Sequence, residues 1–174
     1  MSSVSRNRDN RLNEEQSGPS LELRAWLPYR CSVIANRVSA CLERMYGERF
    51  GLSVPGWRVM AVLGRYAPLS AKEVAVATAM DQVQITRTLT HLASVGLISR
   101  RTDPADRRRI VLKLSRKGQS AYAEIVPLAQ AIEDALLADL SANERAALAR
   151  LSEKVMLRSE ELLGEDVDWK TFVS

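Results

Sequence analysis

The most informative part of this chain is residues 81–118, which read DQVQITRTLTHLASVGLISRRTDPADRRRIVLKLSRKG. In the first third of this stretch, apolar side chains recur three and four residues apart, at Ile85, Leu89 and Leu92. That spacing is typical of a helix that buries one face. Asp81 is a suitable N-cap for such a helix, and Gly96 suits its C-terminal end. The pattern therefore predicts a short amphipathic helix between these two residues.

Two short strands are predicted directly after this helix. Residues 97–101 and 110–114 are two short strand candidates, and the second is predicted to alternate between the two faces of a hairpin. The turn between them, residues 102–109, is polar and ends in three consecutive arginines, Arg107, Arg108 and Arg109. We expect an antiparallel hairpin with a basic tip, which can place a positive side chain in a DNA minor groove.

Another short helix is predicted just before residue 81. Ser70 and Glu73 have the spacing of a capping box, and a turn at residues 78–80 separates this helix from the next. Two short helices joined by a tight turn form a helix-turn-helix. The second helix offers side chains that can pair with base edges: Gln82, Gln84, Thr86, Arg87 and Thr90. Any solvated helix can carry these residue types, so this pattern alone leaves both interpretations open.

One set of residues in this region is more specific: Ile85-Thr86-Arg87 with Leu89 and Leu92, Gly96-Leu97-Ile98, Asp103-Pro104-Ala105-Asp106-Arg107-Arg108, Leu112-Lys113-Leu114-Ser115 and Gly118. Together they resemble the winged-helix signature of the MarR family of transcription regulators. The signature spans about forty residues, and the flanking helices extend the resemblance over roughly residues 24–163.

This resemblance implies a mainly α-helical, α+β winged-helix fold and a homodimer in which the first and the last two helices interlock. A dimer presents two recognition helices, so the expected partner is double-stranded DNA with a pseudo-palindromic operator. In the resembling family, the pair formed here by Asp106 and Arg108 braces an arginine that enters the minor groove, and Arg107 lies beside it. We therefore expect a sequence-specific transcription regulator, acting as a repressor.

The helices outside the winged helix carry long apolar stripes. In the first, a stripe with 4-3-4-3-4 spacing is formed by Leu27, Cys31, Ile34, Val38, Cys41 and Met45. A long helix after Ser115 is expected to run toward Leu140, and a capping box at Ser141 and Glu144 opens the last helix. A chain this small would struggle to cover these stripes alone, which also favours a dimer.

We expect five parts: a flexible tail (1–22), a dimerisation helix (23–47), a winged helix-turn-helix DNA-binding domain (53–115), two dimerisation helices (116–165) and a C-terminal tail (166–174). The charge distribution fits this division. Residues 81–118 carry nine Lys and Arg against three Asp and Glu, whereas residues 119–174 carry five against eleven. A basic middle segment before an acidic end indicates a surface for a polyanion, or a solvated basic face.

The composition argues against several other classes of protein. The chain has one histidine, two cysteines without a CxxC spacing and no GxGxxG motif, which argues against catalytic, metal and phosphate sites. We therefore expect no enzyme activity, no metal and no cofactor. No apolar run approaches the ~20 residues of a membrane span, and residues 1–9 have no apolar signal core. A soluble, cytoplasmic protein without a membrane partner is expected.

An effector site is implied by the resemblance only. Many similar proteins bind small aromatic anions and then release DNA. Tyr29, Arg30, Trp57 and Arg58 are residues that can supply a stacking wall and a carboxylate partner. Residues 27–30, Leu-Pro-Tyr-Arg, also resemble regulators of aromatic-acid degradation genes, some of which respond to acyl-CoA thioesters. The alternative is that Trp57 belongs to the core and that both arginines are ordinary surface residues.

Two further interpretations remain open. Some regulators of this type sense oxidants through a cysteine near the start of the first helix, and Cys31 lies in that neighbourhood. Against this, Cys31 and Cys41 both lie on the apolar stripe, where cysteine acts as a small hydrophobic residue. A non-specific architectural DNA-binding protein would also carry a basic winged helix. Footprinting distinguishes it from a regulator, which protects one short symmetric site.

Overall fold

The computed structural model describes residues 20–103, 106–163 and 167–172 of the chain. In chain order the elements are α2 (Leu27–Phe50), α3 (Val54–Tyr66), α4 (Ala71–Thr78), α5 (Gln82–Ser94), β1 (Ile98–Thr102), β2 (Ile110–Leu114), α6 (Arg116–Leu136), α7 (Ala142–Leu162) and the 3-10 helix η1 (Trp169–Phe172). They divide into two compact units, one ending at Tyr122 and the other beginning at Ala123, so that α6 runs through the boundary. Residues 1–19 of the expected N-terminal tail, and part of the expected C-terminal tail, lie outside the described residues.

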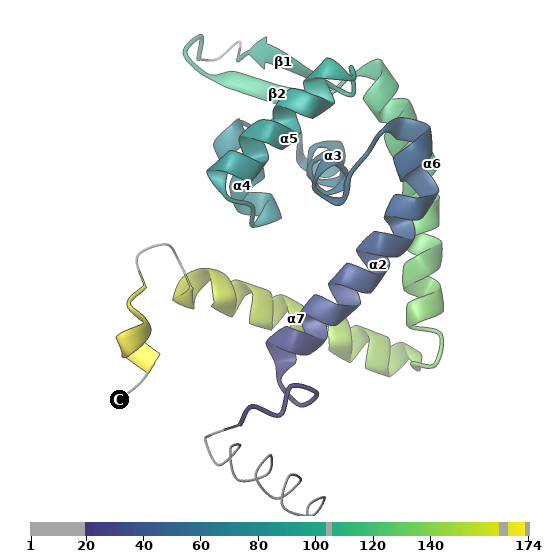
Figure 1. Cartoon of the computed structure of the whole chain (residues 1–174), viewed down its shortest axis with the longest axis vertical. Coiled ribbons are helices and arrows are strands. Elements are labelled where there is room, and N and C mark those ends of the chain that lie inside the picture. The colour runs from purple at the N-terminus through teal and green to yellow at the C-terminus, as the bar shows by residue number, and fades with distance from the viewer. Residues whose placement is uncertain (1–19, 104–105, 164–166, 173–174) are drawn as a thin grey trace, which may run out of the picture. The chain divides into compact units, whose positions relative to one another are not determined.

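In the first unit, three short helices pack around one apolar core. α3 contacts both α4 and α5, and the hairpin lies against α5 (Figure 1). The core is built from one face of each helix together with the hairpin: Val59, Met60, Leu63, Val74, Ile85, Leu89, Leu92, Leu97, Ile98, Val111, Leu112 and Leu114. The predicted buried face of α5 is confirmed, as is the order helix, turn, helix and hairpin.

The hairpin is antiparallel and is tied to the helix-turn-helix by backbone hydrogen bonds. β1 and β2 pair from Ile98 opposite Leu114 to Thr102 opposite Ile110. The loop before α4 adds a bridge, because Leu69 and Leu112 exchange N–H···O bonds of 3.3 and 2.7 Å. The wing and the first helix of the motif are therefore held in one body.

The helix starts follow the capping signals in the sequence. Each of four cap side chains accepts a hydrogen bond from a backbone N–H three residues on: Ser53, Ser70, Asp81 and Ser141. Ser115 accepts in the same way from Gly118 at 3.0 Å. A side chain at Gly118 would collide with the Leu97 carbonyl, 1.9 Å from the position of a Cβ. Glycine here lets the start of α6 lie directly on the chain that enters β1.

α2 differs in three respects from its sequence-based expectation. It begins at Leu27, four residues after the expected residue 23. It continues through Gly47 to Phe50 and ends where Gly51 adopts a left-handed conformation, φ 64°. An isolated glycine is tolerated inside a helix, whereas a positive φ favours glycine, so Gly51 is the true end. The buried residues of α2 are Leu42 and Tyr46, and neither lies on the predicted apolar stripe. That stripe is outside the protomer's core, with Leu27, Ile34 and Met45 each 49% exposed.

The second unit is helical and has little core of its own. α6 contains Pro127 and ends at Leu136, four residues before the expected Leu140. α7 begins at the predicted capping box, but none of its side chains is buried. No helix within the described ranges has both the length and the apolar character needed to cross a bilayer.

Candidate nucleic-acid interface

The surface of α5 opposite its buried face is open to solvent. Asp81 caps the helix, with Oδ1 accepting from Gln84 N at 2.7 Å, so the first turn is well defined. The predicted base contacts are all exposed: Gln82, Gln84, Thr86, Arg87 and Thr90. His91, one turn from the helix end, instead contacts the Gly51 carbonyl at 3.1 Å. The N-terminal part of α5 is thus the part free to meet a second molecule.

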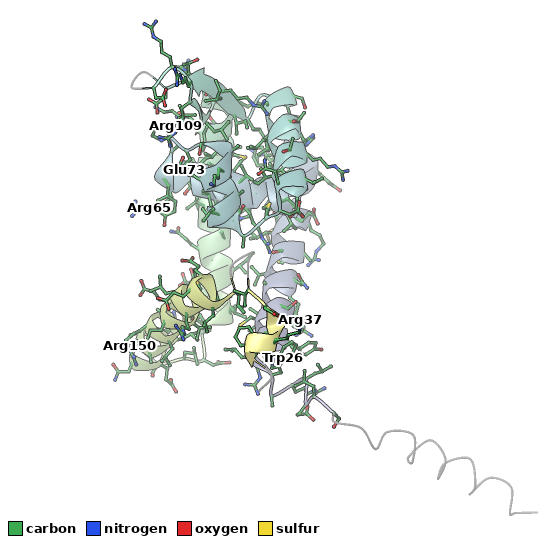
Figure 2. The ribbon with its side chains drawn as sticks, turned by 90° about the vertical axis from the view of Figure 1, so that its left-hand side faces the viewer. Trp26, Arg37, Arg65, Glu73, Arg109 and Arg150 are labelled. Atoms are coloured by element: carbon green, nitrogen blue, oxygen red, sulfur yellow. The ribbon has the colours of Figure 1, made fainter. Side chains whose placement is uncertain are left out.

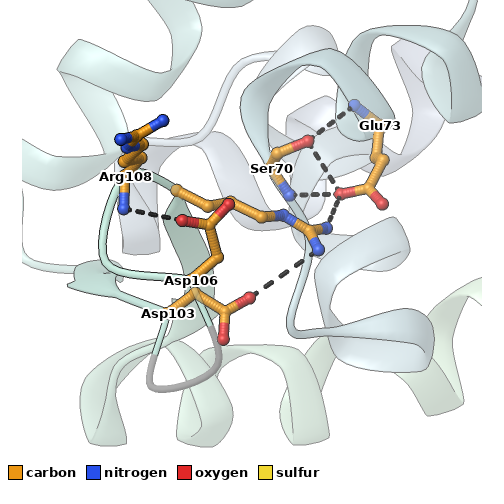
Figure 3. Close-up of polar contacts among 6 residues, drawn as sticks. Ser70, Glu73, Asp103, Asp106 and Arg108 are labelled. Atoms are coloured by element: carbon orange, nitrogen blue, oxygen red, sulfur yellow. Dashed lines mark hydrogen bonds and ion pairs between the residues drawn. The ribbon is translucent and has the colours of Figure 1, made fainter.

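Two arginines are exposed at the tip of the hairpin, Arg107 and Arg108. Asp106 Oδ1 accepts a hydrogen bond of 3.0 Å from the backbone N–H of Arg108 (Figure 3). This bond fixes the backbone of Arg108 rather than its guanidinium. That Asp106 braces an arginine which enters the minor groove remains a prediction. The contact that the structure gives Asp106 is with the backbone N–H of Arg108.

Arg109 has a different environment from its two neighbours. Its Nη2 lies 2.5 Å from Glu73 Oε2 on α4, and its Nη1 lies 3.7 Å from Asp103 Oδ2 (Figure 3). Figure 2 shows the side chains of Glu73 and Arg109 close together on one side of the winged helix. The third arginine of the run is therefore an internal tie between the hairpin and the helix-turn-helix.

Glu73 has two roles at once. Its Oε2 accepts from Ser70 N at 2.6 Å and from Ser70 Oγ at 2.7 Å, which completes the capping box of α4, and it also receives Arg109. Hydrogen bonds from the Ser70 backbone, from its hydroxyl and from Arg109 together lower the pKa of Glu73 to about 2. Contact with Glu73 also raises the pKa of Arg109 above its ordinary value. Both groups are charged at neutral pH.

This ion pair was not predicted from the sequence. Glu73 and Arg109 are 36 residues apart, and nothing in the run Arg107-Arg108-Arg109 shows which arginine turns inward. The only local signal is the capping box, because its glutamate stands at a helix start where a cation can approach.

Two of the four proposed effector residues, Trp57 and Arg58, line a shallow pocket of about 310 Å³ on the first unit. The other lining residues come from the same helix and from the end of α4: Ala61, Val62, Ala77 and Thr78. Trp57 is partly buried and Arg58 is exposed. The pocket is therefore lined by the aromatic side chain of Trp57, by small side chains that are mostly apolar, and by the cationic side chain of Arg58.

Trp57 is part of an aromatic cluster that was not predicted from the sequence. The Trp57 ring centroid is 5.9 Å from both Tyr46 and Tyr122. Tyr46 is fully buried, and its hydroxyl has no hydrogen-bond partner among the described residues. Burial, with a further contribution from Glu43, raises the pKa of Tyr46 to about 12, so the hydroxyl stays protonated at neutral pH. The i, i+4 spacing of Leu42 and Tyr46 was the available signal.

The other two proposed effector residues, Tyr29 and Arg30, lie elsewhere in the protomer. They are exposed in the first turn of α2, where Arg30 Nε donates to the Arg24 carbonyl. Tyr29 precedes Tyr46 by 17 residues, or about 25 Å of helix. The structure therefore does not bring this pair to the Trp57 pocket within one chain.

In the described part of the chain, the cysteines and the metal-binding residue types form no cluster. Cys31 is exposed and Cys41 is partly buried, and both are free thiols. Among the described residues, no three or more His, Cys, Asp or Glu side chains are placed to hold a metal ion.

A helix-turn-helix with an exposed second helix, joined to a basic two-stranded wing, defines the winged-helix class of DNA-binding proteins. A sequence profile described as MarR family matches residues 50–109, which run from the end of α2 to the last wing arginine. The repressor NicR of Pseudomonas putida is 31% identical over 105 residues, which are 60% of this chain and 66% of NicR.

Solved structures agree with this class. A MarR family transcriptional regulator from Silicibacter pomeroyi is 26% identical, with a TM-score of 0.73 over 83% of this chain and 97% of its own. BpsR of Bordetella bronchiseptica, whose DNA binding is regulated by 6-hydroxynicotinic acid, shares the fold at 24% identity, with a TM-score of 0.66 over 87% of this chain and 100% of its own. Residues 50–109 therefore form a MarR family domain, and the chain has the fold of that family's transcription regulators.

Proposed function

We propose that this protein is a sequence-specific repressor that binds a pseudo-palindromic operator as a homodimer and is released by a small aromatic acid or its CoA thioester. The observation that carries the proposal is the joint exposure of two surfaces on one compact unit. α5 presents its polar face, and the wing presents Arg107 and Arg108. A recognition helix reads base edges in a major groove while a wing arginine reaches the neighbouring minor groove.

Dimerisation is supported by the apolar surface left open on the outer helices. α7 buries none of its residues, although Leu148, Leu151 and Val155 form a stripe along it. The stripe on α2 is equally exposed, with Leu27, Ile34 and Met45 each at 49%. Apolar area of this extent is typical of an interface. A symmetric dimer would present two copies of α5, which predicts two half-sites about one helical turn apart.

The Trp57 pocket supports a small aromatic carboxylate as the effector. Its volume of about 310 Å³ suits a single-ring acid, with the ring against Trp57 and the carboxylate beside the Arg58 guanidinium. A CoA thioester would insert its acyl group only. The regulation of BpsR by 6-hydroxynicotinic acid supports the same ligand class. Tyr29 and Arg30 can join this pocket only if a second copy of the chain supplies them.

The operator proposal is tested by footprinting the full chain on DNA selected from a random pool. We expect one short, symmetric protected site. Arg108→Ala removes two cations per dimer and should weaken binding to operator and scrambled DNA alike, flattening the log–log salt dependence by up to about two units. Protection without a fixed boundary would support an architectural protein instead. Unchanged binding by Arg108→Ala to both DNAs would overturn the wing assignment.

The effector proposal is tested by measuring release of that operator by aromatic acids and their CoA thioesters. Arg58→Ala should keep basal DNA binding and lose most of the response, because the carboxylate partner is gone. Arg65→Ala is the matched control, since Arg65 is exposed on the same helix but outside the pocket. An equal response in all three proteins would contradict the pocket assignment.

A second candidate mechanism is oxidant sensing, favoured by the exposure of Cys31. Peroxide should then release the operator from the parent protein and not from Cys31→Ser. Cys41→Ser is the control, because Cys41 is partly buried on the same helix. Release by aromatic acids in both variants, without a peroxide response, would leave the effector pocket as the switch.

A further inference from the structure

One stripe of α5 combines four exposed residues, three of which are β-branched. Val83, Thr86, Arg87 and Thr90 follow the spacing i, i+3, i+4 and i+7, so they lie along one face. Ile85, Leu89 and Leu92 form the opposite, buried face. The stripe therefore points away from the protein's own core.

Val83 is the least expected member of this stripe. It is 60% exposed in the first turn of α5, and its sequence neighbours Gln82 and Gln84 are exposed as well. A β-branched residue is a poor choice for a solvated helix position, and this one packs little against the core. Its branched side chain is thus not explained by helix formation or by burial.

The two threonines also present apolar groups. Thr86 Oγ1 donates to the Gln82 carbonyl at 2.7 Å, and Thr90 Oγ1 donates to the Thr86 carbonyl at 2.8 Å. Each hydroxyl is therefore engaged by the helix backbone, which leaves the γ-methyl as the free end of the side chain. Together with Val83, these residues form a row of methyl groups interrupted only by Arg87.

We propose that this methyl row, Val83, Thr86 and Thr90, reads the C5-methyl groups of thymines in the operator, with Val83 as a specificity-determining residue. The inference rests on the proposed DNA binding and adds the base chemistry that α5 selects. In the major groove the thymine methyl is the apolar feature of a base pair, and apolar side chains recognise it by contact. Val83 lies in the first turn of α5, the part of a recognition helix that meets base edges.

The proposal is tested with the full chain and an operator selected from random-sequence DNA. Each thymine in turn is replaced by deoxyuridine, which lacks only the methyl group. Loss of one buried methyl contact should weaken binding about fourfold in one half-site and about 16-fold when both half-sites are changed. The effect should be confined to one or two thymines per half-site.

Val83→Ala identifies the protein side of the contact. This variant should bind the parent operator less tightly. At the thymine that Val83 contacts, replacement by deoxyuridine should weaken binding of the parent protein but not of the variant; this loss of affinity is the deoxyuridine penalty. Val83→Thr, which keeps one methyl, should retain part of the penalty. Val76→Ala is the matched control, because Val76 is a 73% exposed valine on α4; it should show the parent's full penalty.

The outcomes separate the two proposals. Enrichment of an operator whose binding changes less than twofold at every deoxyuridine would overturn the methyl row and leave the DNA-binding proposal standing. A penalty that is the same in the parent and in Val83→Ala would also overturn the role of Val83. If the selection enriches no sequence, the proposed function fails, and the inference fails with it.

Discussion

α5 and α7 are both amphipathic helices, yet they use their apolar residues in opposite ways. α5 has 13 residues and buries three of them, Ile85, Leu89 and Leu92, in the core of the first unit. α7 has 21 residues and buries none. Along α7, Leu151 and Val155 are about half exposed. The winged helix thus carries a core of its own, whereas α7 carries an apolar surface that its own protomer leaves open.

This contrast separates residues that stabilise the protomer from residues that stabilise the proposed dimer. A buried leucine in the first unit loses its packing whenever that unit unfolds, at any protein concentration. A half-exposed leucine on α7 gains packing only when another surface covers it. Substitutions in the two helices should therefore respond differently to protein concentration.

The largest effect is expected in the core. Leu92→Ala should cost about 2–5 kcal/mol of unfolding free energy, because a fully buried leucine leaves a cavity. The cost is measured by urea unfolding at several protein concentrations and should not change with concentration. Leu151→Ala is the counterpart on α7, and its cost should grow as concentration rises and the dimer forms. If the loss of unfolding free energy is independent of protein concentration for both variants, Leu151 does not lie in a dimer interface.

The second prediction concerns assembly itself. Leu151→Glu places a carboxylate in the proposed interface and should weaken dimerisation roughly tenfold or more, since burying an unpaired charge is costly. Sedimentation equilibrium measures the association. Ser152→Glu adds the same charge at the neighbouring exposed position and should have a smaller effect. A monomeric parent protein at micromolar concentration would contradict the interface.

The helix starts could be predicted from the sequence because their signals are local. Ser70 with Glu73, Asp81 and Ser141 with Glu144 each mark a helix start within three residues, and the structure confirms all of them. Hydrophobic spacing likewise identified the buried face of α5. Such patterns depend on neighbours along the chain, so the sequence displays them directly.

Contacts between distant segments could not be predicted in the same way. The stripe expected on α2 is real as a pattern, but α3 packs on a different side of that helix, where Leu42 and Tyr46 are buried. Periodicity shows that a helix has an apolar face and does not show which neighbour covers it. The ion pair between Arg109 and Glu73 could not be predicted for a similar reason. The sequence does not show which of three consecutive arginines contacts this carboxylate.

The two capping boxes give the smallest and most specific test of the comparison. Ser70–Glu73 in the first unit and Ser141–Glu144 in the second have the same hydrogen-bond pattern. The pKa of Glu144 is lowered by the hydroxyl and the backbone of Ser141, and that of Glu73 is lowered to about 2 by the backbone and hydroxyl of Ser70 and by Arg109. The boxes differ in this one cation.

We therefore expect the two glutamates to titrate at different pH values, with Glu73 the lower. A folded-state pKa below the ordinary value of 4.5 stabilises the fold above that pH, and the contribution is lost as pH falls from 4.5 toward about 2. Carboxyl chemical shifts measured by NMR should show that Arg109→Leu raises the pKa of Glu73 and leaves Glu144 unchanged. The stability deficit of Glu73→Gln should shrink over the same pH range. Identical titration of both glutamates in the parent would show that Arg109 does not hold Glu73 in solution.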